Sequence, residues 1–348
     1  MGCRLQHEFG QARRIGIVRT DRVGDMVLTL PMVRAIHRVN PRAEVLIFAH
    51  SRTEALLRGQ PEVAAYGFVD REPLRELLRR YRPEVLFFPR PVLQEAWEAY
   101  RQRVPCRIGS GYRWYSGLFT HRIYEHRRLG QWHEAQYNVR MVEFAAGVQG
   151  LPVELVAPRL DSAAQMRVRE LLEEIGAPPR FWVLHPGGGG SAPRWSPQAF
   201  GELGKRLNAA GIPCVFTGTA AESAYAEAIR AVFPEARLLF GRTTLEELIA
   251  LLECAAGLVA NSTGVVHLAA ALGVPVVGLY ARSPEHHPRR WGPCARRAIV
   301  LVPPDTAAPQ ELEAIPVEAV VEAVRCLHMA AEAALLDAVG VGALHVER

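Results

Sequence analysis

The sequence predicts an α/β protein of two domains, and three observations lead to this fold class. A chain of 348 residues is longer than one hydrophobic core usually supports, so two domains are expected. Short apolar runs alternate with helical stretches along the chain, a pattern typical of parallel sheets. Polar turns follow several of these runs, where open α/β sheets bind their ligands. The composition, 49% hydrophobic and 22% charged, is typical of a soluble globular protein.

In the first half we expect strands and helices in alternation, followed by a long loop. Apolar runs predict strands over residues 15–19, 44–48, 84–88 and 106–108. Helices are expected over residues 26–39, 73–81, 93–103 and 134–148, with Pro31 breaking or restarting the first one. Residues 109–130 are rich in Tyr, Trp, Arg and Gly without periodicity, which indicates a loop of the length that often carries function.

The second half repeats this rhythm after a linker that we place between about residues 150 and 180. We divide the chain into two domains, residues 1–160 and residues 161–348. Strands are expected over residues 181–184, 213–216, 237–239, 257–260, 274–279 and 298–302. Helices are expected over residues 163–175, 197–209, 221–232, 245–254, 264–272 and 317–339. By analogy with other two-domain folds, the last helix packs back on the first domain.

The polar turn Asn261-Ser262-Thr263-Gly264 is the most informative stretch of the chain. It lies between an expected strand and a short helix, so it falls at the carboxyl end of a parallel strand. Ser262 or Thr263 can cap the helix, whose free N–H groups favour an anion such as phosphate. A capped helix that touches no ligand is the alternative for this turn taken alone.

A second turn, His185-Pro186-Gly187-Gly188-Gly189-Gly190, follows the first expected strand of the second half. Its four glycines allow backbone N–H groups to approach a ligand, and Arg194 supplies a charge suited to phosphate. Ser196 and Pro197 then start a helix as its N-cap and first residue. Without a lysine the turn is no Walker motif, and a flexible loop is the alternative. Two such turns on neighbouring strands favour a nucleotide site.

A third turn, residues 20–25, follows the first strand and ends in Gly24-Asp25. Asp25 stands where a helix begins, so a carboxylate N-cap is one interpretation. The other is a general base that takes a proton from an acceptor hydroxyl. Spacing alone leaves both open.

These blocks resemble glycosyltransferase family 9, the heptosyltransferase type. The similarity runs from Arg14 to about Leu301 and rests on four segments in order: residues 17–31, His185-Pro186-Gly187 with Arg194-Trp195, residues 261–275, and residues 290–293. The resemblance implies GT-B architecture, with two Rossmann-like domains whose parallel sheets face a central cleft. It implies that residues 1–160 form the acceptor-side domain and that residues 161–348 form the nucleotide-sugar-binding domain. It also implies inverting transfer of heptose from ADP-heptose to a lipopolysaccharide core, without a metal or other cofactor.

The resemblance assigns roles to individual residues. It implies that Asp25 is the catalytic base and that Glu246 holds the ribose of the nucleotide. The other donor-binding residues that it implies are Gly187, Gly188, Arg194, Ser262, Thr263, Gly264 and His267. Structural alternatives are a packing role for His267, a solvated charge for Arg194, and a first-turn acid for Glu246 beside a Thr244/Glu247 capping box.

The sequence departs from the family pattern at Ser262, where the family usually has aspartate. That aspartate would bind sugar hydroxyls, so the identity of the transferred sugar is open, although a serine still donates and accepts hydrogen bonds. A nucleotide-sugar-binding protein without transfer activity, or a relative with another sugar or acceptor, is therefore the alternative function.

Charge is distributed unevenly between the two halves. Residues 1–165 carry 25 Arg against 17 acids, whereas residues 166–348 carry 16 Arg and Lys against 19 acids. The basic half is expected to meet an anionic partner, with an arginine-rich solvated surface as the alternative. We predict an anionic glycolipid or oligosaccharide acceptor rather than nucleic acid, bound in part by Arg22, Arg113, Trp114 and Arg122.

The sequence offers no signal for export or for a membrane span. No run of 18 apolar residues exists, and the first residues lack the apolar core of a signal peptide. The six cysteines show no zinc spacing. We therefore expect a cytoplasmic protein that contacts the inner membrane at its surface.

Overall fold

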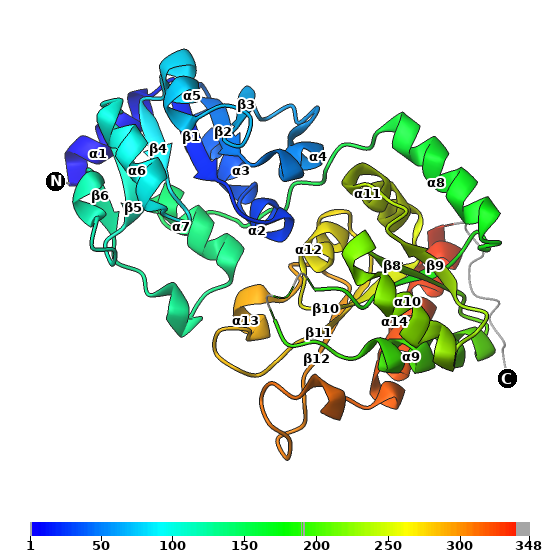
Figure 1. The fold of residues 1–348 in the computed structure, drawn as a ribbon. Helices are drawn as coiled ribbons and strands as arrows, with labels where there is room; N and C mark the ends of the chain where they lie inside the picture. Colours follow the sequence, from blue (N-terminus) through cyan, green and yellow to red (C-terminus); the bar gives the residue numbers. More distant parts are fainter. Residues whose placement is uncertain (1, 189, 191, 339–348) are drawn as a thin grey trace, which may run out of the picture. The chain divides into compact units, whose positions relative to one another are not determined.

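A computed structural model describes residues 2–188, 190 and 192–338, which fold into two compact units (Figure 1). The first unit runs to Arg159 and includes Arg289–Trp291 from the second half of the chain. The second unit begins at Leu160 and contains the remaining residues. Each unit holds one six-stranded parallel sheet with helices on both faces.

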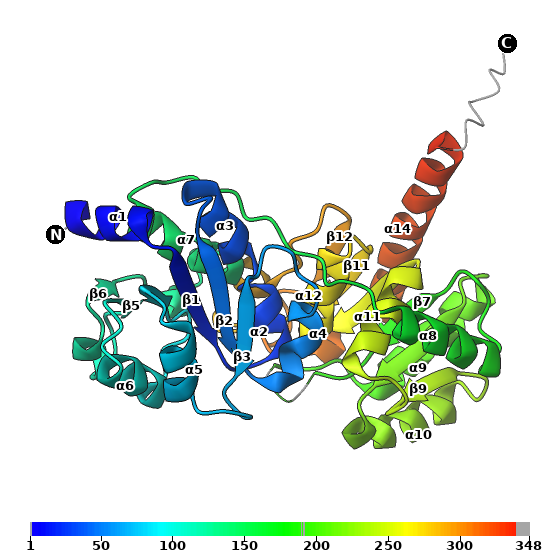
Figure 2. The ribbon, with the colours of Figure 1, turned by 90° about the horizontal axis from the view of Figure 1, so that it is seen from above.

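The sheet of the first unit has the strand order β3-β2-β1-β4-β5-β6, and all its pairings are parallel. The strands are β1 (Arg14–Arg19), β2 (Glu44–Ala49), β3 (Ala65–Phe68), β4 (Val85–Phe87), β5 (Cys106–Ser110) and β6 (His121–Ile123). Figure 2 shows β1, β2 and β3 side by side. The helices are α1 (Gly2–Gln11), α2 (Val23–Val27), α3 (Pro31–Val39), α4 (Glu54–Leu57), α5 (Leu74–Tyr81), α6 (Leu93–Arg101) and α7 (Glu134–Ala146). Short 3₁₀ turns are η1 (Ser51–Thr53), η2 (Ser116–Leu118) and η3 (Arg127–Leu129).

Both faces of this sheet are buried, which explains why its strands are continuous apolar runs. Val18, Leu46 and Phe48 pack with α5 and α6 on one face. Helices α3 and α1 pack against α7. The sequence analysis did not predict α1, α4, β3 or β6. Strand β3 contains Gly67, where a Cβ atom would come within 2.5 Å of Leu77, so glycine allows α5 to approach the sheet.

The expectation of a structureless loop over residues 109–130 is wrong. This segment contains η2, β6 and η3, and β6 pairs in parallel with β5 at the edge of the sheet. Strand β6 has only three residues, His-Arg-Ile, and none of them is fully buried. An edge strand so short carries no apolar alternation, so the sequence gives no signal for it.

The sheet of the second unit has the order β12-β11-β10-β7-β8-β9 and is also parallel throughout. All six predicted strands are present: β7 (Trp182–His185), β8 (Cys214–Gly218), β9 (Arg237–Phe240), β10 (Gly257–Asn261), β11 (Val276–Leu279) and β12 (Ala298–Leu301). The helices are α8 (Ser162–Glu174), α9 (Pro197–Ala209), α10 (Ser223–Val232), α11 (Leu245–Cys254), α12 (Gly264–Ala271), α13 (Pro288–Trp291) and α14 (Val317–Ala338). The 3₁₀ turns are η4 (Ala220–Glu222) and η5 (Leu312–Ala314).

Helices α9 and α11 begin at the predicted capping residues. The Ser196 hydroxyl accepts the N–H of Ala199 at the start of α9, with Pro197 in the first helical position. Thr244 and Glu247 form the predicted capping box of α11. The buried side chains of the last helix, α14, pack within the second unit, against α9 and the second sheet.

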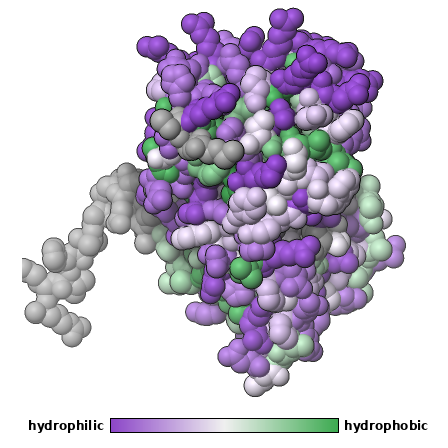
Figure 3. All heavy atoms as spheres, turned by 90° about the vertical axis from the view of Figure 1, so that its left-hand side faces the viewer, coloured by the Kyte–Doolittle hydropathy of each residue, from purple (hydrophilic) through white to green (hydrophobic). Residues whose placement is uncertain are grey.

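The surface offers no sign of a membrane-spanning element. Among the described residues, no helix combines the length and the apolar character that crossing a membrane requires. On the face seen in Figure 3, hydrophobic residues lie in small separate groups among hydrophilic ones. Scattered apolar residues of this kind are normal on a solvated surface.

Candidate functional site

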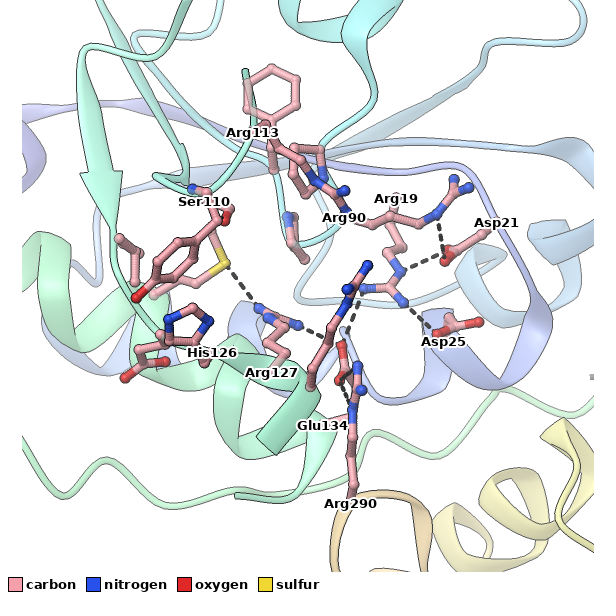
Figure 4. A pocket seen from close by; sticks show the side chains of 18 of the residues that line it. Arg19, Asp21, Asp25, Arg90, Ser110, Arg113, His126, Arg127, Glu134 and Arg290 are labelled. Atoms are coloured by element: carbon pink, nitrogen blue, oxygen red, sulfur yellow. Dashed lines mark hydrogen bonds and ion pairs between the residues drawn. The ribbon is translucent and has the colours of Figure 1, made fainter. Parts of the chain in front are cut away.

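A charged cavity of about 700 Å³ lies in the first unit, at the carboxyl ends of β1, β4 and β5 (Figure 4). Its walls carry six arginines and four carboxylates: Arg19, Arg90, Arg113, Arg127, Arg128, Arg290, Asp21, Asp25, Glu125 and Glu134. Ion pairs between groups of opposite charge shift their pKa values, and these shifts decide which groups can accept or donate a proton.

Arg19 is the last residue of β1 and lies at the centre of these charges, with a side chain only 3% exposed. Its Nε donates to Asp21 Oδ1 at 2.7 Å, and its Nη2 donates to Asp25 Oδ1. Its Nη1 is buried and makes no hydrogen bond. Arg19 therefore binds Asp21 through Nε and Asp25 through Nη2.

Asp25 is the third residue of α2, and the N-cap of that helix is Arg22. The alternative of Asp25 as an N-cap is thus wrong, because its carboxylate turns toward the guanidinium of Arg19. Burial raises the pKa of Asp25, and Arg19 opposes this effect while Asp21 and Glu134 reinforce it. A carboxylate with a raised pKa that faces a cavity is a suitable general base.

Glu134, the first residue of α7, is 3% exposed and contacts three guanidinium groups. Arg127 Nη1 lies 2.5 Å from its Oε1, and Arg290 Nη2 lies 2.9 Å from its Oε2. Arg19 Nη1 lies 3.9 Å from its Oε1. Burial alone would raise the pKa of Glu134, but the three arginines lower it to about 2. Glu134 is therefore ionised at neutral pH.

Another part of the cavity combines aromatic rings with free cations. The rings of Tyr112 and His126 stack with their centroids 3.8 Å apart. Arg113 and Arg128 line the same cavity, and no carboxylate among the described residues pairs with either. Such a surface suits a sugar ring that carries an anionic group.

Only one of the four predicted acceptor residues lines the cavity. Arg113 lines the cavity, whereas Arg22, Trp114 and Arg122 are not among its lining residues. Trp114 is 85% exposed, and Arg122 Nε donates to the carbonyl oxygen of Ser116. The cavity instead contains Arg19, Asp21, Glu134 and the Tyr112/His126 stack, which the sequence analysis missed.

In the second unit the two predicted turns lie side by side. Strands β7 and β10 are neighbours, with His185 opposite Ala260, so the turns that follow them start from adjacent positions. Asn261, which is completely buried, joins them. Its Oδ1 accepts the N–H of Trp195 at 2.9 Å, and its Nδ2 donates to the carbonyl of Pro186 at 2.9 Å.

A carboxylate of the chain already lies against the glycine turn. Glu222 Oε1 accepts the N–H of Gly188 at 3.2 Å, and a Cβ atom on Gly187 would come within 2.5 Å of this oxygen. Glu222 Oε2 also accepts the N–H and the hydroxyl of Thr219. The pattern Thr219…Glu222 after β8 is a capping-box signal that could have identified this residue from the sequence.

The remaining predicted donor residues occupy different positions around these turns. Arg194 is exposed and donates to the hydroxyl of Tyr225. Ser262 and Gly264 are half-buried and flank Thr263, the N-cap residue of α12. His267 is buried within α12, 5% exposed. Glu246 lies in the first turn of α11, after the edge strand β9.

Neither unit shows a cluster with the composition of a metal centre. Among residues 2–188, 190 and 192–338, no group of three or more His, Cys, Asp or Glu side chains could hold a metal ion. The positive charge described above comes from arginine side chains and from the partial charge at helix N-termini.

Comparison with known proteins places the chain in a family. The sequence profile of Glycosyltransferase family 9 (heptosyltransferase) matches residues 92–316, which is more than half of the chain. The chain belongs to glycosyltransferase family 9. The predicted resemblance is therefore confirmed.

Two relatives illustrate this family 9 membership. A Haemophilus influenzae protein named "Putative glycosyltransferase" is 25% identical over 299 residues, which cover 80% of this chain and 86% of that protein. Lipopolysaccharide heptosyltransferase 2 of Escherichia coli K12 is 25% identical over 311 residues, which cover 83% of this chain and 87% of that enzyme.

Solved structures show the same fold. The crystal structure of a glycosyl transferase family 9 protein from Veillonella parvula DSM 2008 has a TM-score of 0.81 at 19% identity, covering 91% of this chain and 98% of that one. E. coli heptosyltransferase WaaC with ADP has a TM-score of 0.68 at 17% identity, covering 90% and 99%. The predicted α/β fold class of GT-B type is confirmed by these likenesses and by the two parallel sheets.

Proposed function

We propose that this family 9 glycosyltransferase is inverting and moves heptose from ADP-heptose to an anionic glycolipid of the lipopolysaccharide core. The observation that carries the proposal is the half-buried Asp25 carboxylate, with its raised pKa, in an arginine-lined cavity. The E. coli relative named as a lipopolysaccharide heptosyltransferase supports this substrate class, and so does the family 9 neighbour solved with ADP.

The proposed reaction is one displacement at the anomeric carbon. Asp25 takes the proton of an acceptor hydroxyl while that oxygen forms a bond to the anomeric carbon of the donor sugar. The bond from this carbon to the diphosphate breaks, and its electron pair leaves with ADP. Attack from the face opposite the leaving group inverts the configuration.

The leaving diphosphate needs positive charge, which the second unit supplies without a metal. Arg194 and the free N–H groups at the start of α12 are the proposed contacts. The turn at Gly187 and Gly188 is the third, although the N–H of Gly188 donates to Glu222 in this structure. Thr263, Gly264 and His267 belong to the same donor site, and Glu246 is the proposed ribose contact.

The acceptor is proposed to bind in the cavity of the first unit. Within the described part of the chain, Arg113 and Arg128 pair with no carboxylate, so they can pair with phosphate or carboxylate groups of the acceptor. The Tyr112/His126 stack offers an aromatic surface beside them. An acceptor of this kind belongs to a glycolipid, so a cytoplasmic enzyme working at the inner membrane surface is part of the same proposal.

Ser262 leaves open a second function, which is nucleotide-sugar binding without transfer. An aspartate at this position would bind sugar hydroxyls more strongly than the half-buried serine. A different donor sugar is the related possibility, because the shorter, uncharged side chain changes what the sugar site recognises.

One experiment separates these functions. Thermal unfolding is measured with a panel of nucleotide-sugars, and the donor with the largest shift is then incubated with core oligosaccharide acceptors and analysed by mass spectrometry. The proposal expects the largest shift with ADP-heptose and a product heavier by one heptose. Binding without any product would support the transfer-inactive alternative, and a larger shift with another nucleotide-sugar would contradict the donor assignment.

A further inference from the structure

The buried carboxylate of Glu134 has no part in the proposed chemistry, yet it is surrounded by three guanidinium groups of the cavity. We propose that Glu134 is a positioning residue, which holds the guanidinium of Arg19 and through it the carboxylate of Asp25 in the orientation that proton transfer requires. This inference rests on the proposed role of Asp25 as the base.

The geometry of Arg19 provides the first argument. Two of its nitrogens, Nε and Nη2, bind Asp21 and Asp25, and the third, Nη1, faces Glu134 at 3.9 Å. A guanidinium is planar and rigid, so the attraction between Glu134 and Nη1 also orients Nε and Nη2. Glu134 forms an ion pair with the buried Nη1, which makes no hydrogen bond to the described residues. Figure 4 shows this sequence of residues across the cavity.

The second argument is that Glu134 is itself held firmly. Arg127 binds its Oε1 and Arg290 binds its Oε2, so each oxygen has its own partner. The residue stands at the start of α7, where the helix dipole favours a carboxylate. One turn later, Asn138 Nδ2 donates to the carbonyl of Leu28 at 2.9 Å, which ties α7 to the segment after α2. These contacts therefore hold the carboxylate of Glu134 in a defined position relative to Asp25.

The third argument concerns charge. Three groups act on Asp25: Arg19 at the end of β1, Asp21 in the following turn, and Glu134 on α7. Arg19 favours the ionised carboxylate, whereas Asp21 and Glu134 disfavour it. Removing the charge of Glu134 removes one of the negative charges that repel the ionised carboxylate of Asp25. The attraction of Arg19 for Asp21 and Asp25 is then no longer shared with Glu134. The pKa of Asp25 should then fall, which makes it a weaker base.

The test compares Glu134→Gln with the wild type in the transfer reaction. We expect kcat to fall by about ten- to hundredfold because the base is misplaced. The acid limb of the kcat–pH profile should move to lower pH. The matched control is Glu143→Gln, since Glu143 is a buried carboxylate on the same helix that accepts the N–H of Leu151 and contacts no cavity arginine. This control should leave the pH profile unchanged.

A second readout does not depend on activity. The carboxyl of Asp25 can be titrated by ¹³C NMR with labelled aspartate, and Asp25→Asn assigns its signal by difference. A titration midpoint at lower pH in Glu134→Gln supports the inference, and an unchanged midpoint together with wild-type kcat overturns it. If Asp25→Asn retains full activity, the proposed role of Asp25 is wrong, while the titration still reports whether Glu134 acts on Asp25.

Folding of the variant needs its own control, because Glu134→Gln leaves the buried Arg19 and the half-buried Arg127 and Arg290 with less compensation. Glu134→Asp keeps the charge but shortens the side chain by one methylene. We expect it to fold, to lower kcat, and to shift the pH profile less than the glutamine variant does. A Glu134→Asp enzyme with wild-type kcat and pH profile would contradict the positioning role even where Glu134→Gln does not fold.

Discussion

The two candidate binding regions differ in the chemical groups that form them. The cavity of the first unit is lined by charged side chains, six arginines and four carboxylates, and several of these form ion pairs with one another. The turns of the second unit consist mainly of backbone, which one buried amide, Asn261, holds together. Charged side chains can tune one another's protonation, whereas backbone N–H groups present fixed dipoles. The first arrangement suits proton transfer, and the second suits holding an anion.

This comparison predicts that the largest loss of turnover comes from the first unit. Asp25→Asn should lower kcat by about 10²- to 10⁴-fold, because it removes the proposed general base. Its affinity for ADP-heptose, measured by isothermal titration, should stay close to wild type, since the donor turns belong to the second unit. A variant that turns over normally would show that the Arg19–Asp25 pair is structural.

The units should also respond differently to acid. Burial lowers the pKa of His185 to about 4, although Glu222 opposes this shift. The unfolded chain gains a proton on this histidine below about pH 6.5, whereas the folded chain does not until about pH 4, so stability is lost as pH falls between these values. The expected loss at pH 5 is about 2 kcal/mol. Glu134 has a lowered pKa instead, so its contribution is lost only below about pH 4.5.

Hydrogen exchange measures this difference directly. Between pH 7 and pH 5, peptides from β7 and β8 should lose protection, corrected for intrinsic rates, while peptides from β1 and β2 keep theirs. His185→Gln, which cannot titrate, should abolish the difference. Equal changes in both units would contradict the assignment of the acid-sensitive group to His185.

Removal of the amide that joins the two turns should weaken donor binding. Asn261→Ala leaves the N–H of Trp195 and the carbonyl of Pro186 buried without this partner, at a cost of about 1–3 kcal/mol in stability. The Kd for ADP should rise by roughly tenfold, because the turns lose their fixed spacing. Asn40→Ala is the control: Asn40 is a buried amide that donates to Phe9 and Ala12, in the first unit. It should cost similar stability and leave the Kd for ADP unchanged.

The smallest effect is expected from the surface charges of the first unit. Arg113→Gln should raise the KM for the acceptor about threefold, because it removes one exposed cation worth at most about 1 kcal/mol. Arg122→Gln should have less effect, since Arg122 does not line the cavity and donates to Ser116. Salt should weaken acceptor binding in the wild type, with a Debye length of about 8 Å at physiological ionic strength. Equal, salt-independent KM values would indicate that these arginines are only part of a solvated surface.

The same contrast explains how much the sequence could predict. The turns after β7 and β10 were readable because each is a contiguous segment between an apolar strand and a capped helix. The second sheet was predicted strand by strand for the same reason. In the first unit only Asp25 and Arg113 of the cavity were identified, because Arg19 and Glu134 are 115 residues apart and neither belongs to a local pattern. Strand β6 was missed because three exposed or half-buried residues carry no periodic signal.

The charge balance around Glu134 has a consequence for how this enzyme can change during evolution. Arg19, Arg127 and Arg290 share one buried carboxylate, so a neutral residue at position 134 leaves surplus positive charge inside the protein. Loss of Arg127 together with Glu134 would leave the net charge of this cluster unchanged, whereas either loss alone would change it. These positions should therefore covary among family members, and a lineage that lost the acid would be expected to have lost one of its arginines as well.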